Sequence, residues 1–226
     1  MVENNRLRVL LSMMPKGDNG NIFAEMTNGL VELLSEEGDS VLDIGSDKPP
    51  VFVSCVAPVF PWVRFTHFRN EGKLIPKHDK KFSGVMDIVY PEGDLNGPYD
   101  LATAFFTLHE LKNPAENLGI AYRKLKEGGN IFVVDYDLKW FGELAKDKKW
   151  GDDEIDENFK NHVFTAGNER KVLSEVNCVR NHSSFGLDDY VKLCSDAGFK
   201  EVSQKSYCVD TPWGRRSKCF LYIGRK

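Results

Sequence analysis

The sequence predicts an α/β fold in which helices cover both faces of a doubly wound, mostly parallel sheet of seven strands. Two observations carry this prediction. Strand-like apolar runs alternate with amphipathic helical stretches along the 226 residues, which is the order expected when crossover helices connect parallel strands. In addition, the stretch from Tyr99 to Asp137 has the pattern strand, helix, strand, with a signal at almost every boundary.

That stretch opens with Leu101–Leu108, an apolar and partly aromatic run of the kind buried in a parallel sheet. A helix start follows at Asn113, Pro114 and Glu116. Asn is a favoured cap, Pro fits the first helical position, and an acid three residues after the cap can bond back to it. These residues predict a helix that begins at Pro114.

The same helix has a predicted body and end. Apolar residues recur at helical spacing in its body, at Leu118, Ala121, Tyr122 and Leu125. Gly128 and Gly129 are predicted to form its left-handed exit. Ile131–Val134 is then predicted to be a second buried strand, which ends at Asp135.

The other elements follow from the same signals. Helical spacing of apolar residues predicts helices over 23–34 and 187–194, which end before Gly38 and Gly198. Residues 50–57 fit a short helix or a strand equally well, because VFVSCV is rich in β-branched residues. The remaining predicted strands are Ser40–Ile44, Trp62–Phe68, Val85–Val89, Val202–Val209 and Lys218–Ile223.

Residues 139–184 follow no regular alternation and are rich in acidic and aromatic side chains. We predict that they form an insert within a single domain spanning 1–226. The aromatic side chains of the insert could stack on a substrate or pack the insert onto the body of the domain. Such aromatic spacing favours the packing role about two to one.

The composition argues against membrane-spanning, secreted, nucleic-acid-binding and disulfide-rich proteins. No apolar run reaches the roughly 20 residues that span a bilayer, and the first 20 residues lack a signal-peptide core. We therefore expect a cytoplasmic protein with no membrane partner. Its net charge of −4 gives no general attraction to nucleic acid. Its five cysteines are odd in number and have no close pairs, so they suggest neither a disulfide framework nor a metal site.

The block from Tyr99 to Asp137 combines an acid that opens a strand, His-Glu-Leu, a Pro-initiated helix, Arg-x-Leu-Lys-x-Gly-Gly and a strand ending in Val-Asp. This combination resembles class I S-adenosylmethionine-dependent methyltransferases, most of all the small-molecule branch typified by ubiquinone and menaquinone biosynthesis enzymes. The resemblance continues more weakly from about Phe23 to the C-terminus. It implies a Rossmann-like methyltransferase fold with an antiparallel C-terminal hairpin, S-adenosylmethionine as cofactor, and an insert that governs the acceptor.

The loop after the first strand, VLDIGSDKPP, matches the family's glycine-rich cofactor loop only in part. Asp43 and Gly45 agree with the family's acid-x-Gly opening. Asp47 stands where the second glycine belongs, and Pro49 where the third does. These side chains add bulk, and Pro49 lacks an amide donor. The loop is therefore degenerate, although Asp47 could pair with the cofactor's ammonium group.

The resemblance implies further cofactor contacts after the later strands. Glu71, with Asn70 as a weaker choice, follows the second strand and would hold the ribose hydroxyls, unless it is simply an acid in an exposed turn. Asp94 would accept from the adenine amino group, and the amide of Leu95 would face the adenine ring. Phe105, near the end of the fourth strand, is a further predicted contact.

The catalytic candidates are His109, Asp135 and Tyr136. His109 follows the fourth strand at the mouth of the expected site and could act as a base, since the ordinary pKa of histidine lies near working pH. Alternatively, His109 supports the loop or the edge of the cofactor. Asp135 and Tyr136 face the acceptor side in the resemblance. Asp100 is expected to order the strand entrance rather than to contact a ligand.

Three functions stay open at this point. The first is an active methyltransferase that acts on a small-molecule acceptor. The second is an inactive methyltransferase-fold protein that binds or regulates a partner, as the altered loop allows. The third is an RNA or protein methyltransferase. The sequence favours the first. A homodimer is left open as its assembly.

Overall fold

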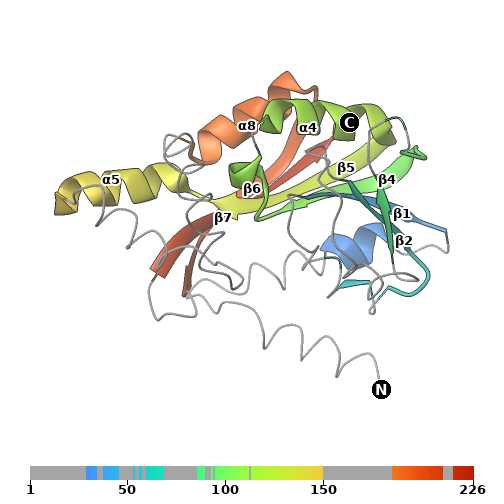
Figure 1. Cartoon of the computed structure of the whole chain (residues 1–226), viewed down its shortest axis with the longest axis horizontal. Coiled ribbons are helices and arrows are strands. Elements are labelled where there is room, and N and C mark those ends of the chain that lie inside the picture. Colours follow the sequence, from blue (N-terminus) through green and yellow to red (C-terminus); the bar gives the residue numbers. More distant parts are fainter. Residues whose placement is uncertain are drawn as a thin grey trace, which may run out of the picture.

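The structure is a computed structural model, and it describes residues 29–34, 38–45, 53, 56–57, 60–68, 86–89, 93, 95–111, 113–149, 185–210 and 216–226. Within these residues the strands form one mixed sheet of seven strands (Figure 1). Their spatial order is β3-β2-β1-β4-β5-β7-β6. The strands are β1 (Ser40–Ile44), β2 (Arg64–Phe68), β3 (Met86–Val89), β4 (Tyr99–Phe105), β5 (Leu125–Tyr136), β6 (Lys200–Asp210) and β7 (Arg216–Arg225).

Strands β1 to β5 run parallel to one another, whereas β7 lies antiparallel to both β5 and β6. The predicted doubly wound, mostly parallel sheet with an antiparallel C-terminal hairpin is therefore confirmed. The direction of winding reverses between β1 and β4, the neighbours at the centre of the order. In open α/β sheets, ligands bind beyond the carboxyl ends of the strands at such a reversal.

Helices lie on both faces of the sheet. Helices α4 (Pro114–Lys124) and α8 (Leu187–Asp196) cover one face, and the helical residues 29–33 lie on the other (Figure 1). Each face has its own apolar core, one around Leu118, Tyr190 and Phe220, and one around Leu30 and Phe65. Burial of both faces explains the long apolar runs in β1, β4 and the second half of β5.

The start of α4 is confirmed and its exit is corrected. The Asn113 side chain accepts from the Glu116 amide at 3.2 Å and donates to the Glu116 carboxylate at 3.1 Å. The helix ends at Lys124, because Leu125 is already extended and pairs with Tyr99. Gly128 does have a positive φ of 77°, but it belongs to an irregularity within β5 and does not form the exit of the helix.

Several predicted strand boundaries were wrong, and β5 in particular begins at Leu125 rather than Ile131. Strand β2 begins at Arg64 rather than Trp62, whose indole donates to the Leu34 carbonyl at 3.2 Å from a turn. Strand β4 ends at Phe105, and the 3-10 helix η3 (Leu108–Glu110) follows. Phe106 has a positive φ of 46°, which is incompatible with a continuing strand.

The insert begins with regular structure that the sequence reasoning did not predict. Helix α5 (Leu138–Lys148) follows β5 directly. The Asp137 carboxylate accepts from the Trp140 amide at 3.1 Å, which satisfies one of the free donors at a helix start. Residues 150–184 of the insert lie outside the described residues.

The ambiguity at residues 50–57 is resolved toward a helix at its described positions, since the Ala57 amide donates to the Val53 carbonyl at 2.8 Å. Among the helices that the structure describes, none has the length and apolar character needed to cross a bilayer.

Candidate functional site

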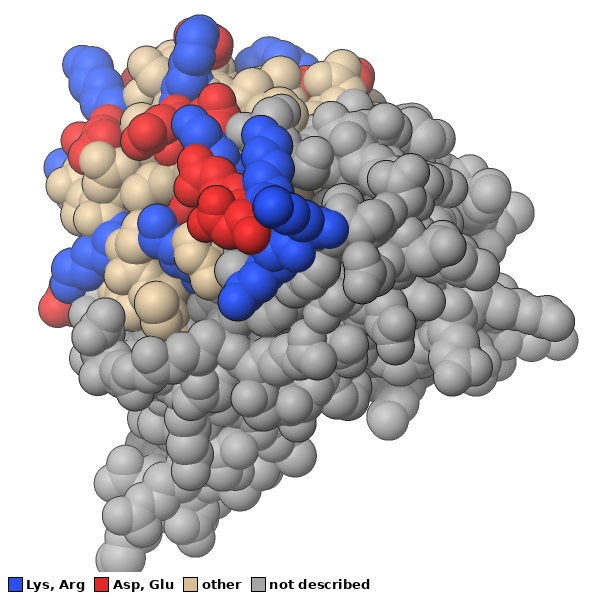
Figure 2. Space-filling view, turned by 90° about the vertical axis from the view of Figure 1, so that its left-hand side faces the viewer, with Lys and Arg blue, Asp and Glu red and all other residues tan. Residues whose placement is uncertain are grey.

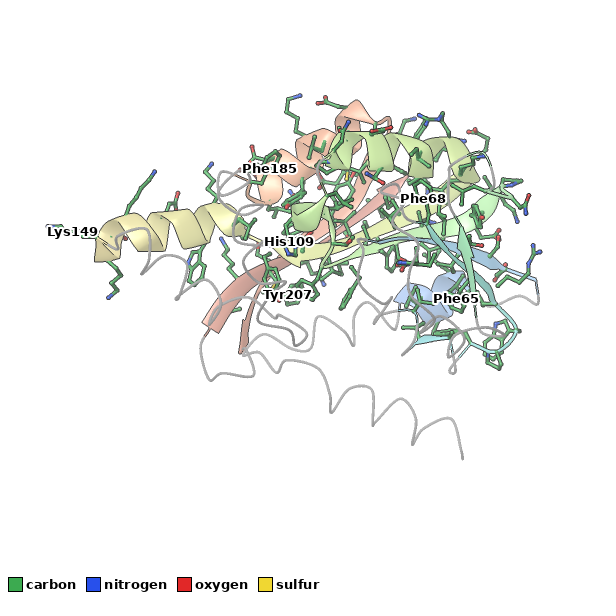
Figure 3. The ribbon with its side chains drawn as sticks, in the orientation of Figure 1. Phe65, Phe68, His109, Lys149, Phe185 and Tyr207 are labelled. Atoms are coloured by element: carbon green, nitrogen blue, oxygen red, sulfur yellow. The ribbon has the colours of Figure 1, made fainter. Side chains whose placement is uncertain are left out.

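His109 and Asp135 meet at the carboxyl ends of β4 and β5. Phe106 turns the chain out of β4 with its positive φ, and η3 then brings His109 back over the sheet (Figure 3). Asp135 is the penultimate residue of β5. The two side chains lie 2.6 Å apart, between His109 Nδ1 and Asp135 Oδ1. We refer to this pair as the His109–Asp135 dyad.

The Asp135 carboxylate is completely buried and accepts three hydrogen bonds. Besides His109 Nδ1, its donors are the His109 amide at 3.1 Å and the Tyr136 amide at 2.8 Å. Several strong donors are what a buried carboxylate requires. Because an ionised carboxylate can only accept, His109 Nδ1 carries the proton, and Nε2 is the basic nitrogen of the ring.

An aromatic cluster of Phe105, Phe106 and Tyr136 adjoins the dyad. The ring centroids of Phe106 and Tyr136 are 4.5 Å apart, those of Phe105 and Phe106 4.7 Å, and those of His109 and Tyr136 5.5 Å. Contacts of this kind stabilise ring positions beyond simple burial. The three predicted catalytic residues therefore lie together, and Phe105 is connected to them through Phe106.

Asp43 and Gly45, the predicted start of the cofactor loop, lie at the end of β1 in contact with a residue of β2. Asp43 Oδ2 bonds to His67 Nδ1 at 2.7 Å, and Asp43 Oδ1 accepts from the Thr103 hydroxyl at 2.7 Å. The His67 imidazole lies against Gly45, where a Cβ would come within 1.9 Å of His67 Cε1. His67 is thus a buried residue within β2 and does not belong to the loop that follows it.

The other predicted cofactor residues are less informative. Leu95 is buried in the core beneath α4, and its carbonyl accepts from Lys124 Nζ at 3.2 Å. Asp47, Glu71 and Asp94 lie outside the described residues, and their roles stay predictions.

Asp100 lies at the opposite, amino-terminal end of the sheet, where it joins β1 to β4. Its carboxylate accepts from the Ser40 amide and hydroxyl at 2.9 Å each and from Lys126 Nζ at 2.5 Å. Burial alone would raise the pKa of Asp100, but the hydrogen bonds from Lys126 and Ser40 lower it below its ordinary value. The prediction that Asp100 orders the strand entrance is confirmed.

Cys219 on β7 lies opposite Tyr136 in the strand register. Burial raises the pKa of its thiol well above the ordinary value, and the charge of Asp135 raises it further. Cys219 is therefore a neutral, apolar neighbour of the dyad. Among the described residues, no group of three or more His, Cys, Asp or Glu side chains could hold a metal ion.

Comparison with known proteins identifies the family. A family model described as a methyltransferase domain matches residues 19–204, which is most of the chain. The chain belongs to this methyltransferase family. No curated protein sequence matches the chain.

Solved structures show the same fold at low identity. A SAM-dependent methyltransferase from Methanosarcina mazei has a TM-score of 0.55 and 15% identity, and the match covers 87% of this chain and 96% of that one. The N-methyltransferase NodS from Bradyrhizobium japonicum, solved with S-adenosyl-L-homocysteine, has a TM-score of 0.53 and 12% identity over 92% of this chain and 89% of that one. At such identities these likenesses show the methyltransferase fold alone.

Sequence reasoning missed two residues of the site in this methyltransferase domain. The sequence patterns assign His67 only to the predicted strand Trp62–Phe68, and Thr103 only to the apolar run Leu101–Leu108. The signal that could have found them is strand alternation: His67 lies on the same face of β2 as Phe65, and the register places it beside Asp43.

Proposed function

We propose that this protein is an S-adenosylmethionine-dependent methyltransferase that acts on a small-molecule acceptor. The family match supports methyl transfer. The cofactor is supported by the methyltransferase from M. mazei and by NodS, which was solved with S-adenosyl-L-homocysteine. A small acceptor is supported by the N1-methyltransferase from Burkholderia thailandensis solved with bound 1,6-didemethyltoxoflavin, which matches with a TM-score of 0.50 and 14% identity over 89% of this chain and 76% of that one. The finer likeness to the ubiquinone and menaquinone branch is part of this proposal and rests on sequence motifs alone.

The His109–Asp135 dyad is the observation that carries the proposal. When bound, S-adenosylmethionine supplies a methyl group activated by a sulfonium centre. Methyl transfer from such a group is an in-line displacement, and the protein mainly positions the two partners. Asp135 Oδ1 accepts from His109 Nδ1, with the two atoms 2.6 Å apart, so Nε2 can accept a proton from an acceptor N–H or O–H. An acceptor that loses a proton on methylation is therefore the kind that this site suits.

The residues present fit a cofactor at the carboxyl ends of β1 and β4. Gly45 follows β1 at the reversal of winding, and His67 Nε2 is a buried nitrogen with no hydrogen-bond partner among the described residues. A polar ligand could supply that partner. We propose that Asp47, Glu71, Asp94 and the amide of Leu95 add the remaining contacts, and that the insert 139–184 covers the acceptor side within the single domain 1–226.

One observation favours the second candidate, a methyltransferase-fold protein that binds or regulates a partner. Both carboxylate oxygens of Asp43 are already bonded within the protein, and His67 occupies the space over Gly45. An RNA or protein substrate has weaker support. On the face shown in Figure 2, the described residues carry Lys and Arg side chains intermixed with Asp and Glu, whereas nucleic-acid binding relies on clustered positive charge.

Calorimetric titration of the purified protein with S-adenosylmethionine and S-adenosylhomocysteine tests the proposal. We expect a saturable heat with at least one of them. Screening of small aromatic and heteroaromatic N–H and O–H acceptors with methyl-labelled cofactor would then test turnover. A folded protein that releases no heat with either compound would favour the binding or regulatory candidate.

A further inference from the structure

Three polar side chains form a row across neighbouring strands at the carboxyl ends of β2, β1 and β4. In the strand register, Asp43 lies directly opposite His67 on one side and Thr103 on the other. Two hydrogen bonds of 2.7 Å connect the row, and all three residues are buried. We refer to them as the His67–Asp43–Thr103 row.

The hydrogen bonds in the row fix which nitrogen of His67 carries the proton. The Asp43 carboxylate accepts from Thr103 and, being unable to donate when ionised, also accepts from His67 Nδ1. In the neutral ring Nε2 is then a pure acceptor. His67 is only 1% exposed, and Nε2 has no partner among the described residues. A buried acceptor without a donor is unfavourable, and such atoms are uncommon in folded proteins.

The position of Nε2 indicates where a hydrogen-bond donor for this atom would lie. An ideal Cβ on Gly45 would lie 2.3 Å from Nε2 and 1.9 Å from Cε1, so the nitrogen lies directly against the first residue after β1. This is the point where the winding of the sheet reverses, and a ligand is expected beyond the strands there.

We propose that His67 is a cofactor-binding residue whose Nε2 accepts a hydrogen bond from a hydroxyl or ammonium group of S-adenosylmethionine. This inference rests on the proposed function. Asp43 and Thr103 act as positioning residues that hold the ring and its tautomer. Asp43 therefore acts on the cofactor only through His67. The row supplies a polar contact to the cofactor that the degenerate glycine loop does not supply.

The variant His67→Asn separates binding from structure. Its side-chain amide can still donate to Asp43 from the place of Nδ1, but it has no atom at Nε2. Because the amide oxygen and the second N–H of asparagine would be buried in the space left by the ring, we expect a lower melting temperature than that of the wild type, with the protein still folded at the temperature of the titration. Calorimetry should show S-adenosylhomocysteine binding weakened about tenfold, as expected for one lost hydrogen bond. The control Asp100→Asn removes a carboxylate at the opposite end of the sheet, so its melting temperature should fall and its affinity should not change.

Four results would overturn the inference. Affinity in His67→Asn that stays within twofold of the wild type assigns a structural role to the ring, and tighter binding makes the ring an obstruction. No heat in the folded wild type removes the proposed function as well, a failure that is visible before any substitution is made. If His67→Asn does not fold, ¹⁵N NMR of the wild type decides: the Nε2 resonance of His67 should shift on adding S-adenosylhomocysteine, and an unchanged resonance refutes the contact.

Discussion

Replacing Gly45 by alanine should destabilise the protein through one identifiable contact. The φ of Gly45 lies outside the left-handed region, so its backbone conformation suits alanine. The new Cβ would, however, lie 1.9 Å from His67 Cε1, where ordinary contacts begin at 3.4 Å. The ring must move, and moving it breaks the bond to Asp43. Overpacking of this kind costs about 1–3 kcal/mol in the free energy of unfolding.

A double-mutant cycle isolates that contact. In a His67→Ala background the ring is absent, so Gly45→Ala should change the free energy of unfolding by less than about 0.5 kcal/mol. Urea denaturation of the wild type, the two single variants and the double variant gives the coupling energy, which we expect to exceed about 1 kcal/mol. An equal cost of Gly45→Ala in both backgrounds would show that the ring does not lie against Gly45.

Three further predictions concern other parts of the sheet. Asp135→Asn should lower the free energy of unfolding by about 1–3 kcal/mol in urea denaturation, because an amide cannot accept all three of the carboxylate's hydrogen bonds; an unchanged midpoint would argue against this bonding. The pKa of Asp100 is lowered in the folded state, so its contribution to stability is present above its ordinary value of 3.8 and is lost as pH falls through the lowered pKa. Melting curves of the wild type and Asp100→Asn should therefore differ at neutral pH and converge in acid, whereas a gap that widens in acid would contradict the sign. Burial raises the pKa of the Cys219 thiol and Cys208 is exposed, so a thiol reagent at pH 8 followed by mass mapping should label Cys208 and spare Cys219 until the protein is unfolded; rapid labelling of Cys219 in the native protein would contradict its burial.

Much of the fold follows from local signals, which is why it could be predicted. The Asn113, Pro114 and Glu116 signal describes interactions within one helical turn, and the structure shows those bonds. Helix α5 was not predicted because its mixed polar and aromatic sequence did not show that Asp137 caps the start of a helix. The end of α4 was misplaced because a tertiary pairing between Leu125 and Tyr99 overrode the glycine signal.

The candidate site was predictable only in part. The sequence places His109 just after one predicted strand and Asp135 at the end of the next, which brings both residues to the carboxyl ends of neighbouring parallel strands. Their 2.6 Å contact depends on the backbone turn at Phe106, for which no sequence signal was found. The role of His67 depends on strand register and on the space left by Gly45, which are properties of the folded sheet rather than of any one segment.

At Phe106, next to the dyad, the backbone conformation and the packing of the side chain favour different residue types. A bulky residue with φ of 46° is strained by about 1–3 kcal/mol, yet its ring packs on Tyr136 at 4.5 Å. Glycine would relax the backbone and lose the ring, so no single residue type satisfies both demands. The turn that positions His109 is consequently less stable than an unstrained turn would be. Substitutions selected only for a higher melting temperature should therefore tend to change this turn first.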